Sequence, residues 1–279
     1  MNKKKDTQVK WAQESWFNKN LQSNSEVSYY NHSSNGYQNF RHLNQIEIIN
    51  KNIEKLTNKN ILDIGCGTGV FTELIRNDHK PSEIYGLDFI SDAIQVAKSN
   101  FRQINFFVSK LPEIKIQKKN FDFVIASEVI YYLNDNAQKI LINNIYDLLN
   151  KDGIIFITSA IGDDYLNEKK IMYLLDSNFK LISKNFSHMY LYNKFILFFN
   201  YAIRLKELID LNMEPNSHEM KAKYKKYLKF TKLPFFYHLL KLICFIGKPI
   251  VKSIILPRIF NFFGLITNPT NIIILAKKK

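Results

Sequence analysis

Cysteine is scarce in this chain of 279 residues, which contains only Cys66 and Cys244. Two distant thiols provide neither a disulfide framework nor metal-ligand spacing, so we expect no metal site and a cytoplasmic location. The first residues, MNKKKDTQVKW, carry charges but no apolar stretch, and they therefore predict no signal peptide. No run of 18 uncharged apolar residues occurs, which argues against a membrane-spanning helix.

Acidic residues are missing from the end of the chain. Between Met220 and Lys279 there are 13 Lys and Arg and no Asp or Glu, whereas the first 219 residues carry 26 basic and 25 acidic side chains. The net charge of +14 therefore belongs almost wholly to one end. Codon bias would explain a lysine-rich composition, but it would not explain the loss of acids over 60 residues.

Apolar residues are plentiful, at 46% of the chain with 14% aromatic, which is enough for a full core. From residue 43 onward, segments with helical spacing alternate with short apolar runs typical of buried strands. This alternation predicts an α/β protein with a mostly parallel sheet covered on both faces. Expected strands cover 60–65, 83–89, 104–109, 121–127, 153–160, 179–186 and 271–279; expected helices cover 43–56, 69–77, 90–101, 136–150 and 165–176.

Three glycines in five positions follow the first expected strand, in KNILDIGCGTGVF (residues 59–71). Such a turn lets a ligand approach main-chain N–H groups. The order Gly-Cys-Gly-Thr-Gly is one residue shorter than the dinucleotide fingerprint, and no Gly-Lys-Ser/Thr follows as in a P-loop. Asp63, two residues before the first glycine, would repel a pyrophosphate but would suit an ammonium beside a sulfonium.

A second carboxylate, Asp88, ends the second expected strand, 19 residues after Gly69. A carboxylate at this point can accept hydrogen bonds from both ribose hydroxyls. The next two residues, Phe89 and Ile90, would flank an adenine ring. Together these features predict a nucleoside with a net cationic tail, S-adenosylmethionine, as the ligand.

The segment ILDIGCGTG resembles the first motif of the class I S-adenosylmethionine-dependent methyltransferases, and Asp88 matches their ribose-binding acid. LLNKDGIIFITSA is similar to their entry into strand five, and LPEIKIQKKNFDFVIASEVIYYL to a segment of nodulation-type N-methyltransferases. The resemblance covers about residues 43–185 and the final strand. It implies a Rossmann-like sheet of seven strands, mostly parallel, whose antiparallel last strand lies between strands five and six.

The resemblance also implies which residues bind the cofactor, with one departure. Where members carry an acid that bonds the adenine amino group, this chain has Lys110, which cannot accept that bond. Ser109 or a backbone group replaces the acid, or cofactor affinity is lower, or the loop is shifted by one residue. The expected cofactor-binding residues are Asp63, Gly65, Cys66, Gly67, Thr68, Gly69, Asp88, Phe89, Ile90, Ser109, Lys110, Leu111 and Ser127.

In this superfamily the end of strand four faces the methyl group. We expect Glu128 to orient or deprotonate the acceptor there, or alternatively to bond nearby backbone, with Tyr131 as a second catalytic candidate. Tyr131 and Tyr132 are adjacent and so are expected to point in different directions. The segment lacks the Asn/Asp-Pro-Pro-aromatic run of nucleobase-amine methyltransferases, and no cysteine follows it for attack on a pyrimidine.

Three histidines are further candidates for a base: His32, His42 and His188. We favour His32, because it lies in an aromatic N-terminal segment that forms a lid over the cofactor in related proteins. Packing or a surface position is the alternative for each.

We expect an N-terminal lid (residues 1–42), a cofactor-binding core (43–189), a basic, apolar helical insertion (190–268) and a closing strand (269–279). The insertion would bind an anionic membrane surface through 220–268, cap the substrate, form a dimer interface or, least expected with two arginines, bind RNA. The hypothesis is methyl transfer to oxygen or nitrogen of a small-molecule, glycan or lipid-linked acceptor, at the inner membrane surface. The alternative is an inactive protein of this fold that binds RNA or membrane.

Overall fold

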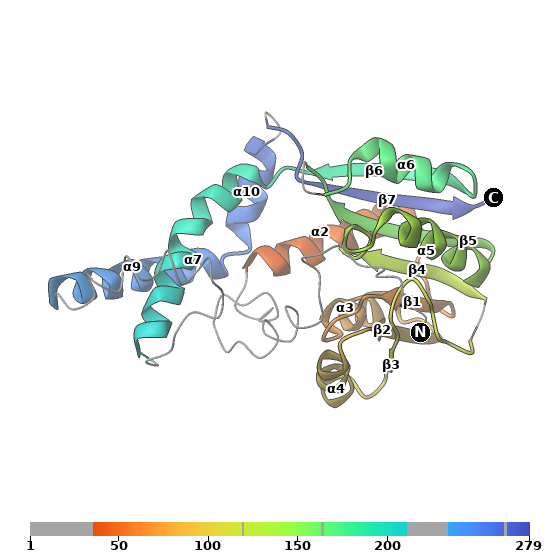
Figure 1. The fold of residues 1–279 in the computed structure, drawn as a ribbon, viewed down its shortest axis with the longest axis horizontal. Helices are drawn as coiled ribbons and strands as arrows, with labels where there is room; N and C mark the ends of the chain where they lie inside the picture. Colours follow the sequence, from red (N-terminus) through yellow and green to blue (C-terminus); the bar gives the residue numbers. More distant parts are fainter. Residues whose placement is uncertain (1–35, 119, 163–164, 211–233, 265–266) are drawn as a thin grey trace, which may run out of the picture. The chain divides into compact units, whose positions relative to one another are not determined.

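The structure is a computed structural model that describes residues 36–118, 120–162, 165–210, 234–264 and 267–279 (Figure 1). Most of the expected lid and His32 lie outside the described residues. The chain forms two compact units. We call them the sheet unit, residues 42–187 and 269–279, and the helical unit, residues 36–41 and 188–268, in each case only where they are described.

Seven strands of the sheet unit form one sheet in the order β3-β2-β1-β4-β5-β7-β6 (Figure 1). Neighbouring strands pair in parallel, except that β7 runs antiparallel to both β5 and β6. This confirms the expected fold, including the place of the closing strand. The strands are β1 (Asn60–Ile64), β2 (Glu83–Asp88), β3 (Asn105–Val108), β4 (Phe121–Ser127), β5 (Leu149–Ala160), β6 (Phe179–Ser187) and β7 (Asn271–Lys278).

Side chains of alternate strand residues point to opposite faces of this sheet. Both faces are apolar, and helices cover each of them. On one face Ile61 and Phe123 pack in a cluster with Ile49 of α2, Ile75 of α3 and Ile94 of α4. On the other face the strands pack against α5 and α6. The helices are α2 (Gly36–Asn52), α3 (Val70–His79), α4 (Ser91–Asn100), α5 (Asp135–Leu148) and α6 (Glu168–Asp176).

The central strands are apolar almost throughout, as burial on both faces requires. Strand β1 is buried from its second residue onward, whereas edge strand β3 has a single buried residue, Phe106. Helix α2 begins at Gly36, earlier than the expected residue 43, because its first turns pack Tyr37 and Phe40 into the core of the helical unit. Burial within the sheet unit thus explains the strand pattern, whereas packing in the helical unit explains where α2 begins.

The carboxyl ends of β1, β2, β4 and β5 meet at one edge of the sheet, because these strands are parallel. Open parallel sheets bind their ligands in the crevice outside this edge. The antiparallel β7 starts where β5 and β6 end, since Asn271 pairs with Ala160 and with Ser187. We call this edge of the sheet the carboxyl edge. The expected site residues lie at it, at or just after the ends of β1, β2, β3 and β4.

The helical unit consists of α7 (Tyr190–Asp210), α9 (Pro234–Lys252) and α10 (Ile255–Phe263). Its core contains Tyr192 of α7 and Cys244 of α9, and a Cβ on Gly247 would lie 2.5 Å from a ring carbon of Phe199. The absent side chain lets α7 and α9 pack closely at this point. Among the helices of the described ranges, none is both long and apolar enough to cross a membrane.

We predict that Ile274→Ala in β7 lowers the free energy of unfolding by roughly 2–5 kcal/mol, the usual cost of emptying a buried Ile site. Ile274 is fully buried in the cluster on the α5 and α6 face. Chemical denaturation followed by circular dichroism measures the change. Val108→Ala on edge strand β3, where the side chain is 53% exposed, is the control and should cost less than about 1 kcal/mol. Equal losses in the two variants would contradict the central position of β7.

Candidate active site

The glycine turn, residues 65–69, connects β1 to α3. Gly65, Gly67 and Gly69 have φ angles of 75°, 55° and 80°, in the left-handed region that glycine adopts without strain. The amides of Gly65 and Cys66 both donate to the Leu87 carbonyl, at 2.7 and 3.0 Å, which fixes the turn against β2. The Cys66 and Thr68 side chains are buried, so the turn offers a ligand chiefly its backbone.

Asp88 lies at the carboxyl end of β2 and joins the glycine turn to the start of α4. Its Oδ2 accepts from the Gly67 amide at 3.0 Å, and its Oδ1 accepts from the Ile90 amide at 2.9 Å. Burial raises the pKa of this carboxyl, and the amides of Ile90, Gly67 and Phe89 oppose the rise. Two amides fix the carboxylate, and its further acceptor capacity fits a pair of ribose hydroxyls.

Asp63 lies deeper, at the end of β1, and is buried. Its Oδ2 accepts a hydrogen bond from the Thr72 hydroxyl at 2.6 Å. Burial raises the pKa of Asp63 to about 7; the Thr72 bond lowers it, and the Asp88 charge raises it further. A buried carboxyl with this pKa takes up or loses a proton near neutrality, and a cation bound nearby favours its charged form. The two acids fit a ligand with a cationic tail.

The expected adenine side is built by the loop after β3. The Ser109 hydroxyl donates to the Glu113 carbonyl at 2.9 Å and accepts from the Lys115 amide at 3.0 Å, so it holds this loop together. Lys110 is exposed, and Leu111 packs against the core before a cis bond to Pro112. Ser109 already bonds its own loop, so its hydroxyl has less capacity left to replace the acid at the Lys110 position. Ile90 is buried, whereas Phe89 is half-buried.

A network of polar side chains lies at the carboxyl edge around Thr158 of β5. The Thr158 hydroxyl donates to Glu128 Oε1 at 2.9 Å and lies 3.0 Å from the Ser127 hydroxyl. Gln45 of α2 bonds both hydroxyls, at 3.1 and 3.3 Å, and Asn271 Nδ2 lies 3.4 Å from Glu128 Oε1. Thr158 and Asn271 thus contact the Glu128 carboxylate, and Gln45 and Ser127 bond to Thr158 behind it. Gln45, Glu128 and Thr158 are all buried.

Glu128 has a left-handed backbone, with φ of 58°, which is uncommon for a residue other than glycine. Its amide donates to the Thr158 carbonyl at 2.9 Å and to the hydroxyl at 3.1 Å, and these bonds hold the turn. The next residue, Val129, packs on the glycine turn, because a Cβ on Gly65 would lie 2.2 Å from its methyl carbon. The expected catalytic acid therefore lies in a turn whose next residue contacts the glycine turn.

The other catalytic candidates have different surroundings. Tyr131 and Tyr132 lie in the short helix η2 (Ile130–Tyr132) with ring centroids 4.4 Å apart and hydroxyls 3.2 Å apart. The expectation that they point in different directions is wrong, because the 3₁₀ turn places the two rings together. His42 is buried and stacks on Phe71, and the His188 ring lies 3.0 Å from the Thr267 carbonyl. Of the three histidines, His32 lies outside the described residues.

Three residues of this network were missed by the sequence analysis: Gln45, Thr158 and Asn271. Thr158 ends an apolar run, and Asn271 begins the antiparallel strand, so the predicted topology already placed both at the carboxyl edge. Gln45 is four residues before Ile49, and this polar position on a buried helix stripe was its only signal.

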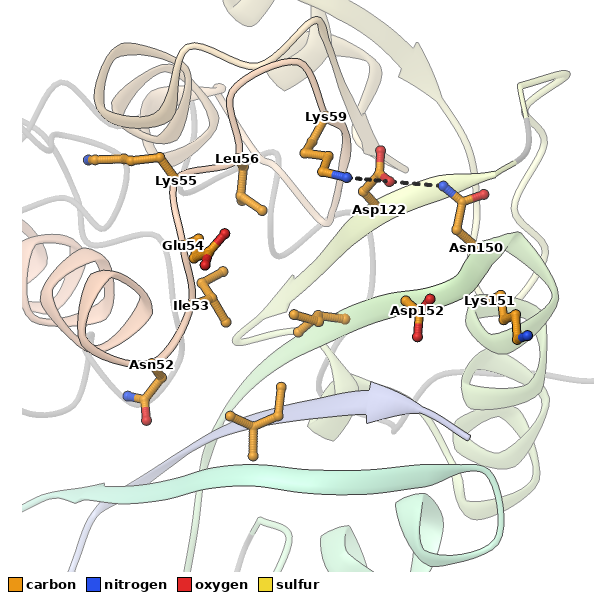
Figure 2. Close-up of a pocket in the computed structure, with 12 residues that line it drawn as sticks. Asn52, Ile53, Glu54, Lys55, Leu56, Lys59, Asp122, Asn150, Lys151 and Asp152 are labelled. Carbon is orange, nitrogen blue, oxygen red and sulfur yellow. Dashed lines mark hydrogen bonds and ion pairs between the residues drawn. The ribbon is translucent and has the colours of Figure 1, made fainter.

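A hollow of about 610 Å³ lies at the amino edge, where β1, β4 and β5 begin (Figure 2). Lys59 Nζ is 3.6 Å from Asp122 Oδ1, and Asn150 Nδ2 donates to the same oxygen at 3.0 Å. None of the expected site residues lines it. The glycine turn and the Glu128 network therefore define the candidate active site, and this hollow does not.

We predict that affinity for S-adenosylmethionine rises severalfold between pH 6 and pH 8. Below a pKa of about 7 Asp63 is mostly neutral, and as the pH rises through that value it gains the charge that attracts a cationic ligand. Calorimetric titrations across this range measure the change, and Asp63→Asn should flatten the profile. Thr72→Val removes a hydrogen bond to the carboxylate and should move the midpoint to higher pH. An Asp63→Asn profile identical to that of the unchanged protein would contradict this role.

The sequence matches the methyltransferase-domain family over residues 55–231, which is more than half of the chain. Malonyl-[acyl-carrier protein] O-methyltransferase of Bacillus anthracis is 31% identical over 110 residues, 39% of each chain. The mitochondrial ubiquinone biosynthesis O-methyltransferase of Saccharomyces cerevisiae is 24% identical over 160 residues, 54% of this chain and 50% of that one. The alignments thus span about two-fifths to half the length of these curated relatives.

A solved structure supports the fold independently. The N-methyltransferase NodS of Bradyrhizobium japonicum, in complex with S-adenosyl-L-homocysteine, superposes with a TM-score of 0.52 at 20% identity, covering 62% of this chain and 88% of that one. The sheet order, the glycine turn with its two acids and the family match agree. The chain belongs to the methyltransferase-domain family, within the class I S-adenosylmethionine-dependent methyltransferases.

Proposed function

We propose that the protein transfers a methyl group from S-adenosylmethionine to an oxygen or nitrogen of a small-molecule, glycan or lipid-linked acceptor, with oxygen favoured. The observation that carries this proposal is the position of Glu128, a buried carboxylate in a left-handed turn whose next residue packs on the glycine turn. Strained backbone of this kind clusters at active sites, where the surrounding structure maintains it.

When bound, the cofactor would supply an electrophilic methyl group on a sulfonium, with a neutral thioether as the leaving group. The glycine turn, Asp88 at the ribose and Asp63 at the amino-acid end would hold the cofactor. Much of the rate enhancement in such a displacement comes from alignment of the two reactants. The hydrogen bonds of Asp88 to two amides serve that alignment, because they fix its carboxylate before the ligand binds.

Glu128 orients the acceptor and, where the acceptor is a hydroxyl or an ammonium ion, takes its proton. Thr158 and Asn271 hold the carboxylate from two strands and so set its direction. Tyr131, three residues further on, would contribute to the acceptor side.

The curated relatives favour oxygen as the acceptor atom, since both of those described above carry O-methyltransferase in their names. The basic segment 220–268 adds a reason to expect a lipid-linked acceptor, since cations without acids are attracted to an anionic membrane. On this proposal the enzyme works in the cytoplasm as a peripheral protein of the inner membrane surface. A substrate cap formed by the same segment would be compatible with the same chemistry.

A second candidate function is a weak or inactive protein of this fold that binds RNA or membrane. Exposed Lys110, at the position of the adenine-binding acid, is the observation that favours it. The two candidates differ in one measurable respect, because only the enzyme transfers labelled methyl groups from the cofactor to an extract.

We predict that Asp88→Ala weakens cofactor binding at least tenfold, because the ribose loses its acceptor and the Gly67 amide loses its partner. Isothermal titration calorimetry measures the affinity, and circular dichroism checks that the variant is folded. Asp147→Ala, which removes an exposed acid on α5, should leave the affinity unchanged. Unchanged affinity in Asp88→Ala would defeat the assignment of this site.

We predict that Glu128→Gln lowers the rate of methyl transfer about 100-fold or more while cofactor affinity changes little, because general base catalysis contributes on this scale. The amide still accepts from Thr158 but takes up no proton. The assay follows label from the cofactor into lipid and water-soluble extracts of cells. Thr158→Val, which leaves the carboxylate but removes a hydrogen bond to it, is the control and should have a smaller effect.

Two outcomes of this assay separate the alternatives. No transfer by the unchanged protein, with cofactor bound normally, would favour the inactive alternative. Equal rates in Glu128→Gln and the unchanged protein would leave alignment as the main source of catalysis and remove the proposed base.

A further inference from the structure

Helix α9 carries two apolar faces, and only one is used inside the helical unit. Leu240, Cys244 and Val251, spaced by four and seven residues, are buried in the core of this unit. A second stripe lies on the opposite side and is exposed, with Phe235 80% and Phe245 78% accessible. Its members are Phe235, Leu239, Leu242, Phe245 and Ile246. Spacings of three, four and seven residues place them on one side of the helix.

Helix α10 repeats this arrangement over its shorter length. Pro257 is buried, and the ring of Phe260 stacks on Phe195 of α7 with centroids 5.3 Å apart. The apolar residues on the opposite side of α10 are exposed: Ile255, Ile259, Phe262 and Phe263. A soluble monomer rarely leaves so many large apolar side chains accessible, and such patches mark interaction sites.

Cations accompany both exposed faces. Lys241, Lys248 and Lys252 recur at spacings of seven and four, so they form a stripe of their own between the two apolar faces of α9. The Lys241 ammonium lies 4.8 Å from the Tyr237 ring centroid, which holds it at the helix surface. Arg258 is exposed on α10, and neither helix contains an acidic residue.

The charge pattern decides which partner fits. Two copies of this chain that paired through these faces would bring two lysine stripes together, and neither α9 nor α10 contributes an acidic residue to such a contact. An anionic bilayer offers negative charge at the depth of the cations and hydrocarbon below it. Interfacial helices have this composition, with Lys and Arg on the polar side and Phe and Leu on the other.

We infer that the exposed faces of α9 and α10 are a membrane-binding surface that inserts Phe235, Phe245 and Phe262 below the headgroups of an anionic bilayer. Lys241, Lys248, Lys252 and Arg258 then contact lipid phosphates. The inference deepens the proposed function and rests on it for the idea that the acceptor is lipid-linked. Neither helix needs to span the bilayer, which agrees with their length and apolarity.

The test is co-sedimentation of the full-length protein with vesicles of phosphatidylcholine alone or mixed with phosphatidylglycerol, over a salt series. We expect binding to the mixed vesicles that weakens as salt screens the charges. Phe245→Ser with Phe262→Ser should weaken it at least tenfold. Tyr173→Ser, at a 70% exposed aromatic on α6, is the matched control and should bind as the unchanged protein does.

A second pair of variants tests the charges. Lys241→Gln with Lys252→Gln should lower the salt dependence of binding, whereas Lys98→Gln with Lys180→Gln, at exposed lysines of the sheet unit, should preserve it. The inference is overturned if the unchanged protein binds neither vesicle, or if the phenylalanine variant binds as before. A concentration-dependent dimer that the phenylalanine variant abolishes, without vesicle binding, would instead assign the faces to a second copy.

Cofactor calorimetry on the same variants separates this inference from the proposed function. Loss of vesicle binding with unchanged cofactor affinity is the expected result. If vesicle binding fails while labelled methyl transfer persists, only the membrane surface is refuted. If vesicle binding holds while no label is transferred, the methyltransferase proposal is the one that fails.

Discussion

The antiparallel insertion of β7 between β5 and β6 is the constraint on which the rest of the structure depends. A strand in this place must start at the carboxyl edge, where its parallel neighbours end. It therefore brings Asn271 to Glu128. Just before the strand, the Thr270 amide donates to the Ser187 carbonyl at 2.9 Å. The same strand contributes fully buried residues to the clusters on both faces of the sheet. One pairing thus completes the core and part of the proposed active site.

The proposed active site combines two carboxylates of different character with a third, Glu128, that accepts a hydrogen bond from Thr158. Asp88 is fixed by backbone amides, while Asp63 is buried, accepts a hydrogen bond from the Thr72 hydroxyl and has a pKa of about 7. Burial, together with the charges of Asp63 and Asp88, also raises the pKa of the Cys66 thiol well above its usual value. The proposed roles of the three carboxylates are to bind a cationic cofactor and to accept a proton from the acceptor.

Much of the sheet unit could be predicted because its signals are local. The apolar runs of the central strands, the glycine turn and Asp88 each stand in a short stretch of sequence. The Glu128 network could not be predicted in the same way, since Gln45, Thr158 and Asn271 come from three distant segments and meet only in the fold. The start of α2 was misplaced for a related reason, because Tyr37 and Phe40 serve a core built mainly from residues beyond 188.

The chain leaves the sheet after Ser187 and re-enters it at Asn271, and these two residues are partners in adjacent strands. Two such ends can be joined by a short turn or by a long segment, because the entropy of closing a loop grows only slowly with its length. The helical unit occupies this join, between two residues that are paired in the sheet. In a fold of this kind the inserted segment can be replaced as a unit. The protein can then acquire a new cellular location or a new acceptor while its cofactor-binding residues stay the same.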